Sequence, residues 1–512
     1  MSVEIDSGPA ESAEAVSLDR KHPEPRHEPL IFERSSHGKI GYSLPPLDVP
    51  AASESSIPAA LLRGDVEGET EVTEVEIARH FTRLSRMNFS IDQALYPLGS
   101  CTMKHNPRTN EEVARLPGFA ASHPLAPEEV SQGTLELAWR LEQLLKELTG
   151  MARVTLQPAA GAQGELAGIL MVRRALEKQG NPRTTVLIPD SAHGTNPASA
   201  HFAGYKVREL KSNARGTLDL DVLEQAMTPD VAALMLTVPN TLGIFEDRIL
   251  DIARIVHAKG GYLYCDGANF NSFVGIAKPG AMGIDVMHMN LHKTFSTPHG
   301  GGGPGSGPVA VVEALVPHLP RPTVERAADG TFRLDFDRPE SIGRLRTFLG
   351  NYGMFVRALA YISAYGNRIG EVARGAVLNA NYIRAGLAGI YHLKYDAPSM
   401  HEVVFSDKKQ AEKGVHNGDI GKRLMDYGFH PPTISFPLIV HGALMIEPTE
   451  TEGKAGLDAF ISAMRAIAQE IEDDPQLVLT APHTTPVSRV DEVGAARNLV
   501  LRWKPDTGSR SS

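Results

Sequence analysis

The sequence predicts an α/β protein whose main domain is a mostly parallel β-sheet covered by helices. Between residues 151 and 312, short apolar segments of strand length alternate with amphipathic segments of helix length. Polar and glycine-rich segments follow several of these strands. Because ligands bind beyond the carboxyl ends of the strands in such sheets, we expect the functional site there.

The predicted elements follow in chain order. Strands are expected at 153–157, 185–189, 205–210, 231–238, 261–265, 285–291 and 308–312, with helices between them at 164–179, 196–203, 219–227 and 248–259. Further helices are expected at 74–87, 133–149, 354–384 and 457–472. This order predicts an N-terminal arm and irregular segment (1–132), a large domain (133–350), a smaller C-terminal α/β domain (351–475) and a tail (476–512).

Composition excludes several classes of protein. The chain has 512 residues and a net charge of −10, which disfavours a broad nucleic-acid surface. Its two cysteines, Cys101 and Cys265, form neither a disulfide framework nor a metal-ligand spacing, so no metal is predicted. The first residues lack the pattern of a secretory signal, and apolar runs such as 231–238 are too short for a bilayer. We therefore expect a cytoplasmic protein that binds neither nucleic acid nor membrane.

The segment MHMNLHKTFSTPHGGGGPGSGP (287–308) places Lys293 at the end of an apolar strand, before four consecutive glycines. A buried lysine there can act as a nucleophile towards a carbonyl group, because desolvation favours the neutral amine. A surface lysine before a flexible loop is the alternative. A nucleotide P-loop is excluded because its glycines precede the lysine, whereas here they follow it.

Asp266 ends the preceding predicted strand, in the segment GYLYCDGAN (261–269). Pyridoxal phosphate (PLP) needs a carboxylate against its pyridine nitrogen, so that the ring can accept an electron pair from the substrate. Capping of the next turn is the alternative role for Asp266. With Lys293 as the Schiff-base lysine on the next strand end, the pair favours a PLP site.

Two more strand ends complete the predicted site. In QPAAGAQGELAG (157–168), Ala160, Gly161 and Ala162 precede or begin a helix and could bind the PLP phosphate through backbone N–H groups, although a tight turn is the alternative.

His193 could stack on the ring or move a proton, or be a structural histidine. Asn240, with Thr237, could bond to the ring hydroxyl. Ala268 and His292, beside the aspartate and the lysine, complete the expected cofactor contacts.

Eight segments resemble the C-terminal half of the glycine cleavage system P-protein family. They are YPLGSCTMKHNP (96–107), QPAAGAQGE (157–165), DSAHGTNPASAH (190–201), CDGAN (265–269), NLHKTFSTPHGGGGPGSGP (290–308), GNYGMFVRALAYI (350–362), DYGFHPPTISFPLIV (426–440) and MIEPTETE (445–452). The resemblance implies a fold-type-I, aspartate-aminotransferase-like PLP-dependent transferase fold. It implies PLP on Lys293 and decarboxylation of glycine, with transfer of the aminomethyl group to the lipoyl arm of H-protein. Gln163 stands where family members often carry histidine.

The resemblance also implies partners. The N-terminal half of the longer P-proteins corresponds to a separate chain, glycine dehydrogenase subunit 1, and two copies of each chain form a heterotetramer. The segments PTISFPLIV and MIEPTETE are expected to shape the access of glycine and of the lipoyl arm. Another fold-type-I activity (amino-acid decarboxylase, aminotransferase or serine hydroxymethyltransferase) and a non-catalytic scaffold subunit remain alternatives. The scaffold is expected to lack the lysine.

Overall fold

The computed structural model describes residues 28–64, 66, 68–300 and 305–504, and these form two compact units. One unit is Phe89–His483, and the other combines the described residues before and after it. The first 27 residues of the expected arm and Gly301–Gly303 of the glycine run lie outside the described residues. The domain boundaries expected at 132, 350 and 475 stay predictions.

The unit Phe89–His483 is built on a seven-stranded sheet. Its strands are β1 (Arg153–Thr155), β2 (Thr185–Pro189), β3 (Lys206–Leu210), β4 (Val231–Thr237), β5 (Tyr262–Gly267), β6 (Val286–Met289) and β7 (Val309–Val311). They lie in the order β1-β7-β6-β5-β4-β2-β3. Strand β7 is antiparallel to both of its neighbours, and the other pairs are parallel. The predicted mostly parallel sheet is confirmed, with every expected strand present.

Helices cover both faces of this sheet because its strands are apolar on both faces. On one face, α5 (Gly161–Lys178) and α6 (Asn196–Phe202) pack over alternate strand residues such as Val186, Ile188 and Met235. On the other, α4 (Glu128–Thr149), α7 (Leu220–Ala226), α8 (Ile249–Ala258) and α10 (Tyr352–Tyr365) share a core with intervening residues such as Leu187 and Leu234. Helix α10, within the range expected for the small domain, thus packs in the core of the large sheet.

The boundaries of α4 and α5 follow from their sequences. Helix α4 ends at Gly150, whose left-handed φ of +67° suits a C-cap glycine. Helix α5 begins at Gly161, directly after the extended Ala160. Its first backbone N–H groups, which have no carbonyl to bond within the helix, therefore lie at the carboxyl-terminal edge of the sheet.

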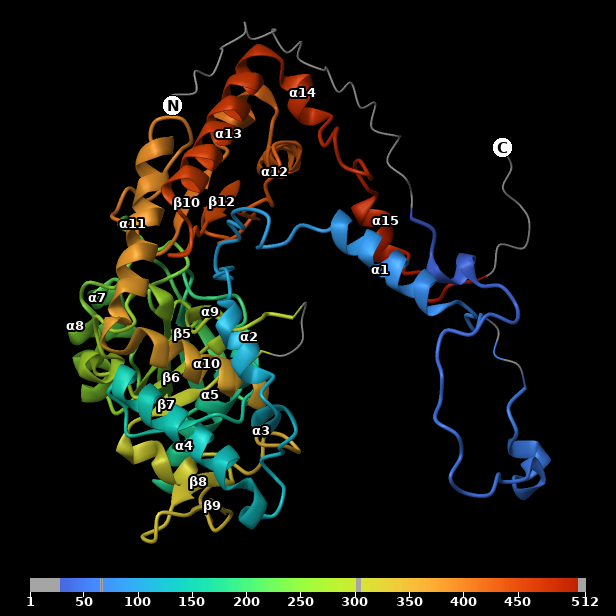
Figure 1. The fold of residues 1–512 in the computed structure, drawn as a ribbon. Helices are drawn as coiled ribbons and strands as arrows, with labels where there is room; N and C mark the ends of the chain where they lie inside the picture. Colours follow the sequence, from blue (N-terminus) through green and yellow to red (C-terminus); the bar gives the residue numbers. More distant parts are fainter. Residues whose placement is uncertain (1–27, 65, 67, 301–304, 505–512) are drawn as a thin grey trace, which may run out of the picture. The chain divides into compact units, whose positions relative to one another are not determined.

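A smaller antiparallel sheet, β10-β12-β11, forms the C-terminal part of the same unit (Figure 1). Its strands are β10 (Val403–Ser406), β11 (Thr433–Ile434) and β12 (Ala443–Ile446), and its helices are α11 (Gly370–Leu387), α12 (Asn417–Asp426), α13 (Lys454–Asp473) and α14 (Pro475–Leu479). One continuous helix over 354–384 was predicted, and this is wrong. The chain breaks between α10 and α11 at Gly366, where φ is +54°.

The remaining elements are short. They are α2 (Arg108–Ala114), α3 (Pro117–Ala120), α9 (Leu291–Thr294) and the hairpin of β8 (Thr323–Arg326) and β9 (Phe332–Asp335). In Figure 1, this hairpin lies at the opposite end of the unit from α13 and α14.

The second unit contains α1 (Glu74–Met87) and α15 (Glu492–Arg497). Helix α1 begins with a capping box of Thr73 and Glu76. The Glu28 carboxylate accepts hydrogen bonds from Arg34 and Arg83 and lies 2.8 Å from His80, which holds the described part of the arm to α1. None of the helices in the described part of the chain has the length and apolarity needed to cross a membrane.

Candidate active site

The strand register brings three polar side chains together at the carboxyl-terminal edge of the large sheet. Asp266 on β5 lies opposite Thr237 of β4 on one side and His288 of β6 on the other. Lys293 follows four residues after β6, on the single helical turn α9 rather than at the strand end. Both Asp266 and Lys293 are buried.

Asp266 is surrounded by groups that stabilise its negative charge. Its Oδ1 accepts the N–H of Ala268 at 2.9 Å and lies 3.2 Å from Nε2 of His288. The Asn196 amide, turned so that its nitrogen faces the carboxylate, donates to Oδ2 at 3.2 Å. The backbone N–H of Ala268 therefore helps to hold the Asp266 side chain in place.

Asp266 remains ionised although its side chain is completely buried. Burial alone would raise the pKa of this carboxyl, but His288, His193, the Ala268 N–H and Lys293 outweigh it and hold the pKa below its ordinary value. A permanently ionised carboxylate at a strand end can keep a bound pyridine nitrogen protonated. The structure therefore brings the two central predicted residues, Asp266 and Lys293, into one buried site.

Lys293 is held by a loop whose role sequence reasoning missed. Its Nζ donates to the carbonyl of Ser100 at 2.7 Å. Two residues of this loop, Ser100 and Thr102, have φ values of +63° and +48°, which are rare for non-glycine residues and concentrate at functional sites. The resemblance had marked the segment 96–107, but nothing in its composition pointed to contact with the lysine.

Lys104 fixes the same loop to the rest of the site. This buried lysine donates to Glu450 at 2.7 Å, to Asn271 at 3.0 Å and to the carbonyl of Thr294 at 2.9 Å. Thr294 follows Lys293 directly, so Lys104 ties the loop, the small α9 turn and the C-terminal segment together. Burial lowers the pKa of Lys104, and Glu450 opposes that shift.

The expected phosphate-binding residues gather at the start of α5. A Cβ placed on Gly307 would lie 2.2 Å from the carbonyl oxygen of Ala160, and one on Gly161 would lie 3.1 Å from the Asn290 amide. Only glycine permits the close backbone approach at position 307, whereas at position 161 a Cβ would require a small shift of the Asn290 side chain. His292 accepts the N–H of Ser306 at 3.2 Å, and burial lowers its pKa to about 3, so it is a neutral imidazole.

The polar groups around α9 fit PLP. Within the described residues, five buried polar atoms between positions 290 and 306 have no hydrogen-bond partner: Asn290 Oδ1, Thr294 Oγ1, Thr297 Oγ1, His299 Nε2 and Ser306 Oγ. Buried polar atoms without partners are costly, which indicates a polar ligand among them. The first N–H groups of α5, from Gly161 and Ala162, add anion-binding donors.

His193 lies at the same edge. Its backbone N–H donates to Thr237 Oγ1 at 2.8 Å, and its Nδ1 lies 2.9 Å from Thr195 Oγ1, which in turn donates to Glu165. Burial is the main cause of its lowered pKa. Stacking of this ring on a cofactor stays a prediction, but the ring is oriented by hydrogen bonds, as such a role requires.

The side-chain amides of Asn240 and Gln163 already bond to protein backbone groups. Asn240 donates to the carbonyl of Gly216 at 2.7 Å and accepts the N–H groups of Leu242 and Ile244. Its predicted contact with a ring hydroxyl therefore stays a prediction. Gln163 accepts the N–H of Ala159 at 2.7 Å, which stabilises the turn before α5.

Two groups of buried histidine and carboxylate side chains adjoin the site. Glu165, Asp266 and His288 form one, and His401, Glu402 and Glu447 form the other; in each, one ligand-type atom per residue lies within 4.8 Å of the others. Sequence reasoning missed the second group, although Glu447 lies in the quoted segment 445–452. No local signal separates a buried glutamate there from the many exposed ones.

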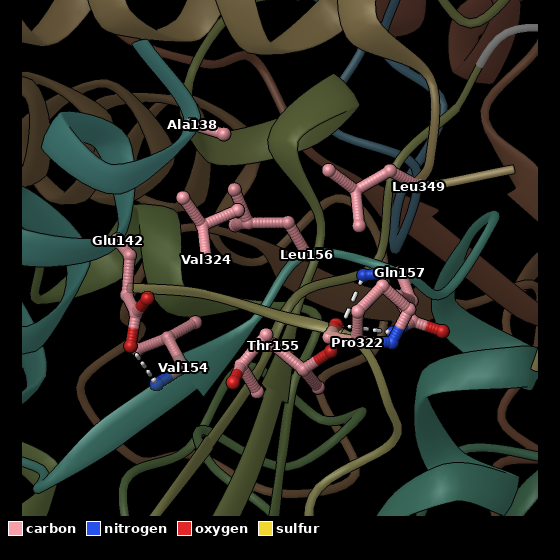
Figure 2. A pocket seen from close by; sticks show the side chains of 10 residues that line it. Ala138, Glu142, Val154, Thr155, Leu156, Gln157, Pro322, Val324 and Leu349 are labelled. Carbon is pink, nitrogen blue, oxygen red and sulfur yellow. Dashed lines mark hydrogen bonds between the residues drawn. The ribbon is translucent and has the colours of Figure 1, made fainter. Parts of the chain in front are cut away.

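Two cavities lie near the sheet. One, of about 30 Å³, is lined by Glu142, Val154 and Gln157 (Figure 2) and holds about one water; Glu142 accepts the N–H of Val154 there. The other, of about 180 Å³, is lined by His193, Phe436 and Leu438 among others, so it opens beside the ring of His193. The second cavity is the one that adjoins the site.

This fold and site define a fold-type-I PLP-dependent enzyme, with PLP as cofactor. Similar solved structures include a glycine decarboxylase (P-protein) of the glycine cleavage system in inhibitor-bound form, at a TM-score of 0.68 and 22% identity over 81% of this chain and 95% of that chain. An aspartate aminotransferase from Thermus thermophilus gives a TM-score of 0.54 at 15% identity, covering 73% of this chain and 99% of that one. At these identities the likeness concerns the fold alone.

The sequence matches the family of the glycine cleavage system P-protein over residues 40–334, and the glycine dehydrogenase C-terminal domain over 372–481. The chain belongs to the glycine cleavage system P-protein family. It is 52% identical to a probable glycine dehydrogenase (decarboxylating) subunit 2 of Chloroherpeton thalassium, over 93% of this chain and 98% of the relative. It is 54% identical to the protein of the same description from Bacillus licheniformis, with the same coverage.

Proposed function

We propose that this chain decarboxylates glycine with PLP and transfers the aminomethyl group to the lipoyl arm of H-protein, releasing CO2. One observation carries the proposal: a buried lysine amine and a buried ionised aspartate lie at one sheet edge, among polar atoms that lack partners within the described residues. PLP, bound to Lys293, would accept the electron pair that is released when the bond between the α-carbon and the carboxylate of glycine breaks.

Other residues of the chain bind the cofactor and hold protons. Asp266 keeps the ring nitrogen protonated, and the Ala268 N–H and His288 keep Asp266 ionised. Backbone N–H groups of Gly161 and Ala162, after Ala160, bind the phosphate. His193 covers the ring face and can hold a proton at Nε2, since Nδ1 faces Thr195.

Three further residues, His292, Asn240 and Phe436, complete the proposed surroundings of the cofactor. His292, next to Lys293, contacts the phosphate end near Ser306. Asn240 lies at the ring-hydroxyl end. Phe436, whose ring centroid is 6.1 Å from that of His193, borders the cavity of about 180 Å³, which supports access of glycine and the lipoyl arm past the segment 432–440.

Partners and location complete the proposal. The relatives are described as subunit 2, which supports a partner chain, glycine dehydrogenase subunit 1, in a heterotetramer with two copies of each. Lipoylated H-protein is the acceptor. The two cysteines of the chain, Cys101 and Cys265, are free thiols, which supports a cytoplasmic location.

The test is exchange of labelled bicarbonate into glycine, measured with the chain, subunit 1, PLP and lipoylated H-protein. Lys293→Ala is expected to abolish both the exchange and the visible absorbance of the lysine-bound cofactor. Exchange without H-protein or transfer of the amino group to a keto acid would point to another fold-type-I activity. Retention of the absorbance in Lys293→Ala would refute the role of this lysine.

A further inference from the structure

Glu402 and Glu447 form a buried pair of carboxyl groups beside Lys293. Glu402 lies before β10 and Glu447 directly after β12, and both are 0% exposed. Glu402 Oε2 accepts the N–H of Ser100 at 2.8 Å, and Glu447 Oε2 accepts the N–H of Thr102 at 2.9 Å. The loop that accepts the Lys293 ammonium is therefore held by both carboxyl groups.

The outer oxygens of the pair lack partners. In the described part of the chain, Glu402 Oε1 and Glu447 Oε1 have no hydrogen-bond partner, and neither has either ring nitrogen of His401. His401 is also 0% exposed, and its Nε2 lies 3.7 Å from Glu402 Oε2. A fully buried imidazole directed at two carboxyl groups indicates that something besides protein atoms, a proton or a cation, is shared there.

The charges around the pair decide between these occupants. Lys293 faces both glutamates, Lys104 faces Glu447, and the Cys101 thiol lies within reach of both. Burial raises the pKa of Glu402 well above its ordinary value and that of Glu447 to about 7. His401 stays neutral because burial and the Lys293 charge lower its pKa to about 3. With two ammonium groups already facing the pair, a proton is favoured over a further cation.

We propose that Glu402 and Glu447 share one proton and act as the proton-holding pair that serves Lys293 during substrate exchange. This inference rests on the proposed function. When the amine of glycine replaces that of Lys293, one C–N bond forms and another breaks, and two protons must pass from the glycine ammonium to the lysine nitrogen. One moves directly between the two nitrogens. The pair accepts the other on its ionised member and returns it to the freed Lys293 amine, so charge and protons balance with no oxidant or reductant.

The experiment compares Glu402→Gln, Glu447→Gln and the double variant in the PLP-loaded protein. Infrared difference spectra between about pH 5 and about pH 9 are expected to show a protonated-carboxyl band that each single variant removes. Each single variant keeps the charge of a singly protonated pair, so the pH at which the lysine-bound cofactor changes colour stays nearly constant. The double variant loses the negative charge, and that pH falls by about one unit.

Activity gives a separate readout. Each single variant is expected to lower bicarbonate exchange about 10²-fold, the scale of losing one proton-transfer group. Glu246→Gln is the matched control, because burial raises the pKa of Glu246 to about 7 and Glu246 accepts one backbone N–H, that of Leu218, without any charge from the lysine site. It is expected to remove an infrared band of its own and to leave the colour change and the exchange unaltered.

Three results would overturn the proposal. They are a protonated-carboxyl band that survives in both single variants, single variants that exchange bicarbonate at the parent rate, and a stoichiometric divalent cation that Glu447→Gln releases. If no coloured PLP complex forms at all, the proposed function fails instead, and the infrared bands alone then decide whether the pair shares a proton.

Discussion

Asp266 and the pair Glu402–Glu447 are carboxyl groups of equal burial that adjoin the same lysine, yet their pKa values shift in opposite directions. Asp266 has its pKa held below the ordinary value by two histidines, a backbone N–H and Lys293, which outweigh burial. The two glutamates each accept one backbone N–H and face each other, so burial raises the pKa of both. The number and charge of the neighbouring donors, not burial, decides which carboxyl group is ionised.

This difference separates two chemical tasks in one site. A permanent anion is needed where a ring nitrogen must stay protonated, and an exchangeable proton is needed where amines replace one another. Strand β5 places Asp266 among donors on its neighbouring strands, whereas the glutamates flank the same end of the paired strands β10 and β12 of the small sheet and bond to the loop 100–102. Each prediction below alters one side of this comparison.

The largest effect is expected for Asp266→Asn. The variant keeps the size of the side chain but removes the charge, so the ring nitrogen loses its proton and the exchange rate falls by about 10³-fold or more, the scale of one preorganised electrostatic group. Exchange of labelled bicarbonate into glycine measures it. The visible absorbance of bound PLP is expected to persist, because Lys293 is untouched.

Asp285→Asn is the matched control for this variant. Asp285 also pairs with a histidine, His257, at 2.8 Å and accepts a backbone N–H, that of Leu263, at 2.7 Å. It lies just before β6, at the opposite edge of the sheet. Equal losses of exchange in the two variants would mean that the charge of Asp266 serves only the fold.

Lys104→Met is expected to destabilise the unit Phe89–His483 by about 3–5 kcal/mol, because it leaves Glu450 buried without its ion partner. It also removes a positive charge that favours ionisation of Glu447, so the Glu447 pKa should rise further. Urea unfolding measures the first effect. Lys278→Met, which breaks an exposed pair with Glu147, is expected to cost less than about 1 kcal/mol; a similar cost for both would refute the argument from burial.

The pH dependence of stability should differ between the two regions. Glu447 has its pKa raised from 4.5 to about 7, so its contribution is complete below about 4.5 and is lost as the pH rises through about 7, amounting to about 3 kcal/mol. Asp266, with a lowered pKa, contributes above 3.8 and loses its contribution as the pH falls below that value.

Melting temperatures between about pH 2 and about pH 8 measure how stability changes with pH at both ends of this range. Glu447→Gln should reduce the loss of melting temperature above about pH 5 and leave the loss at acid pH unchanged. Asp266→Asn should reduce the loss at acid pH and leave the loss above about pH 5 unchanged. A decline that persists undiminished in Glu447→Gln would assign it to another group.

The large sheet could be predicted because each strand carries its own signal. Apolar runs such as 231–238 and the turns after them specify β4 and its neighbours locally, and the structure places them within a few residues of the predicted bounds. The break between α10 and α11 was missed because both flanking segments are helical in period. A single glycine, Gly366, decides the break through its backbone conformation.

The site was predictable only where its residues lie at strand ends of that sheet. Asp266 lies at the end of β5, Lys293 and His193 follow strands, and parallel topology brings such residues together. Ser100, Glu402 and Glu447 come from a loop and a second sheet, at sequence separations of about 300 residues. Their meeting depends on the pairing of β12 with β10 and with Leu98, just before the loop, and no local pattern encodes such long-range pairing.

The smallest effect is expected for Tyr264→Phe. The buried Tyr264 hydroxyl lies 2.9 Å from Nδ1 of His288, whose Nε2 lies 3.2 Å from Asp266, so the hydroxyl orients the histidine that supports the anion. Its loss should cost about 1 kcal/mol of stability and less than about tenfold in exchange. Tyr391→Phe removes a comparable bond to the carbonyl of Met464 in α13 and should cost similar stability with no change in exchange. If exchange fell equally in both variants, the effect would come from stability, and the support of Asp266 by Tyr264 through His288 would be disproved.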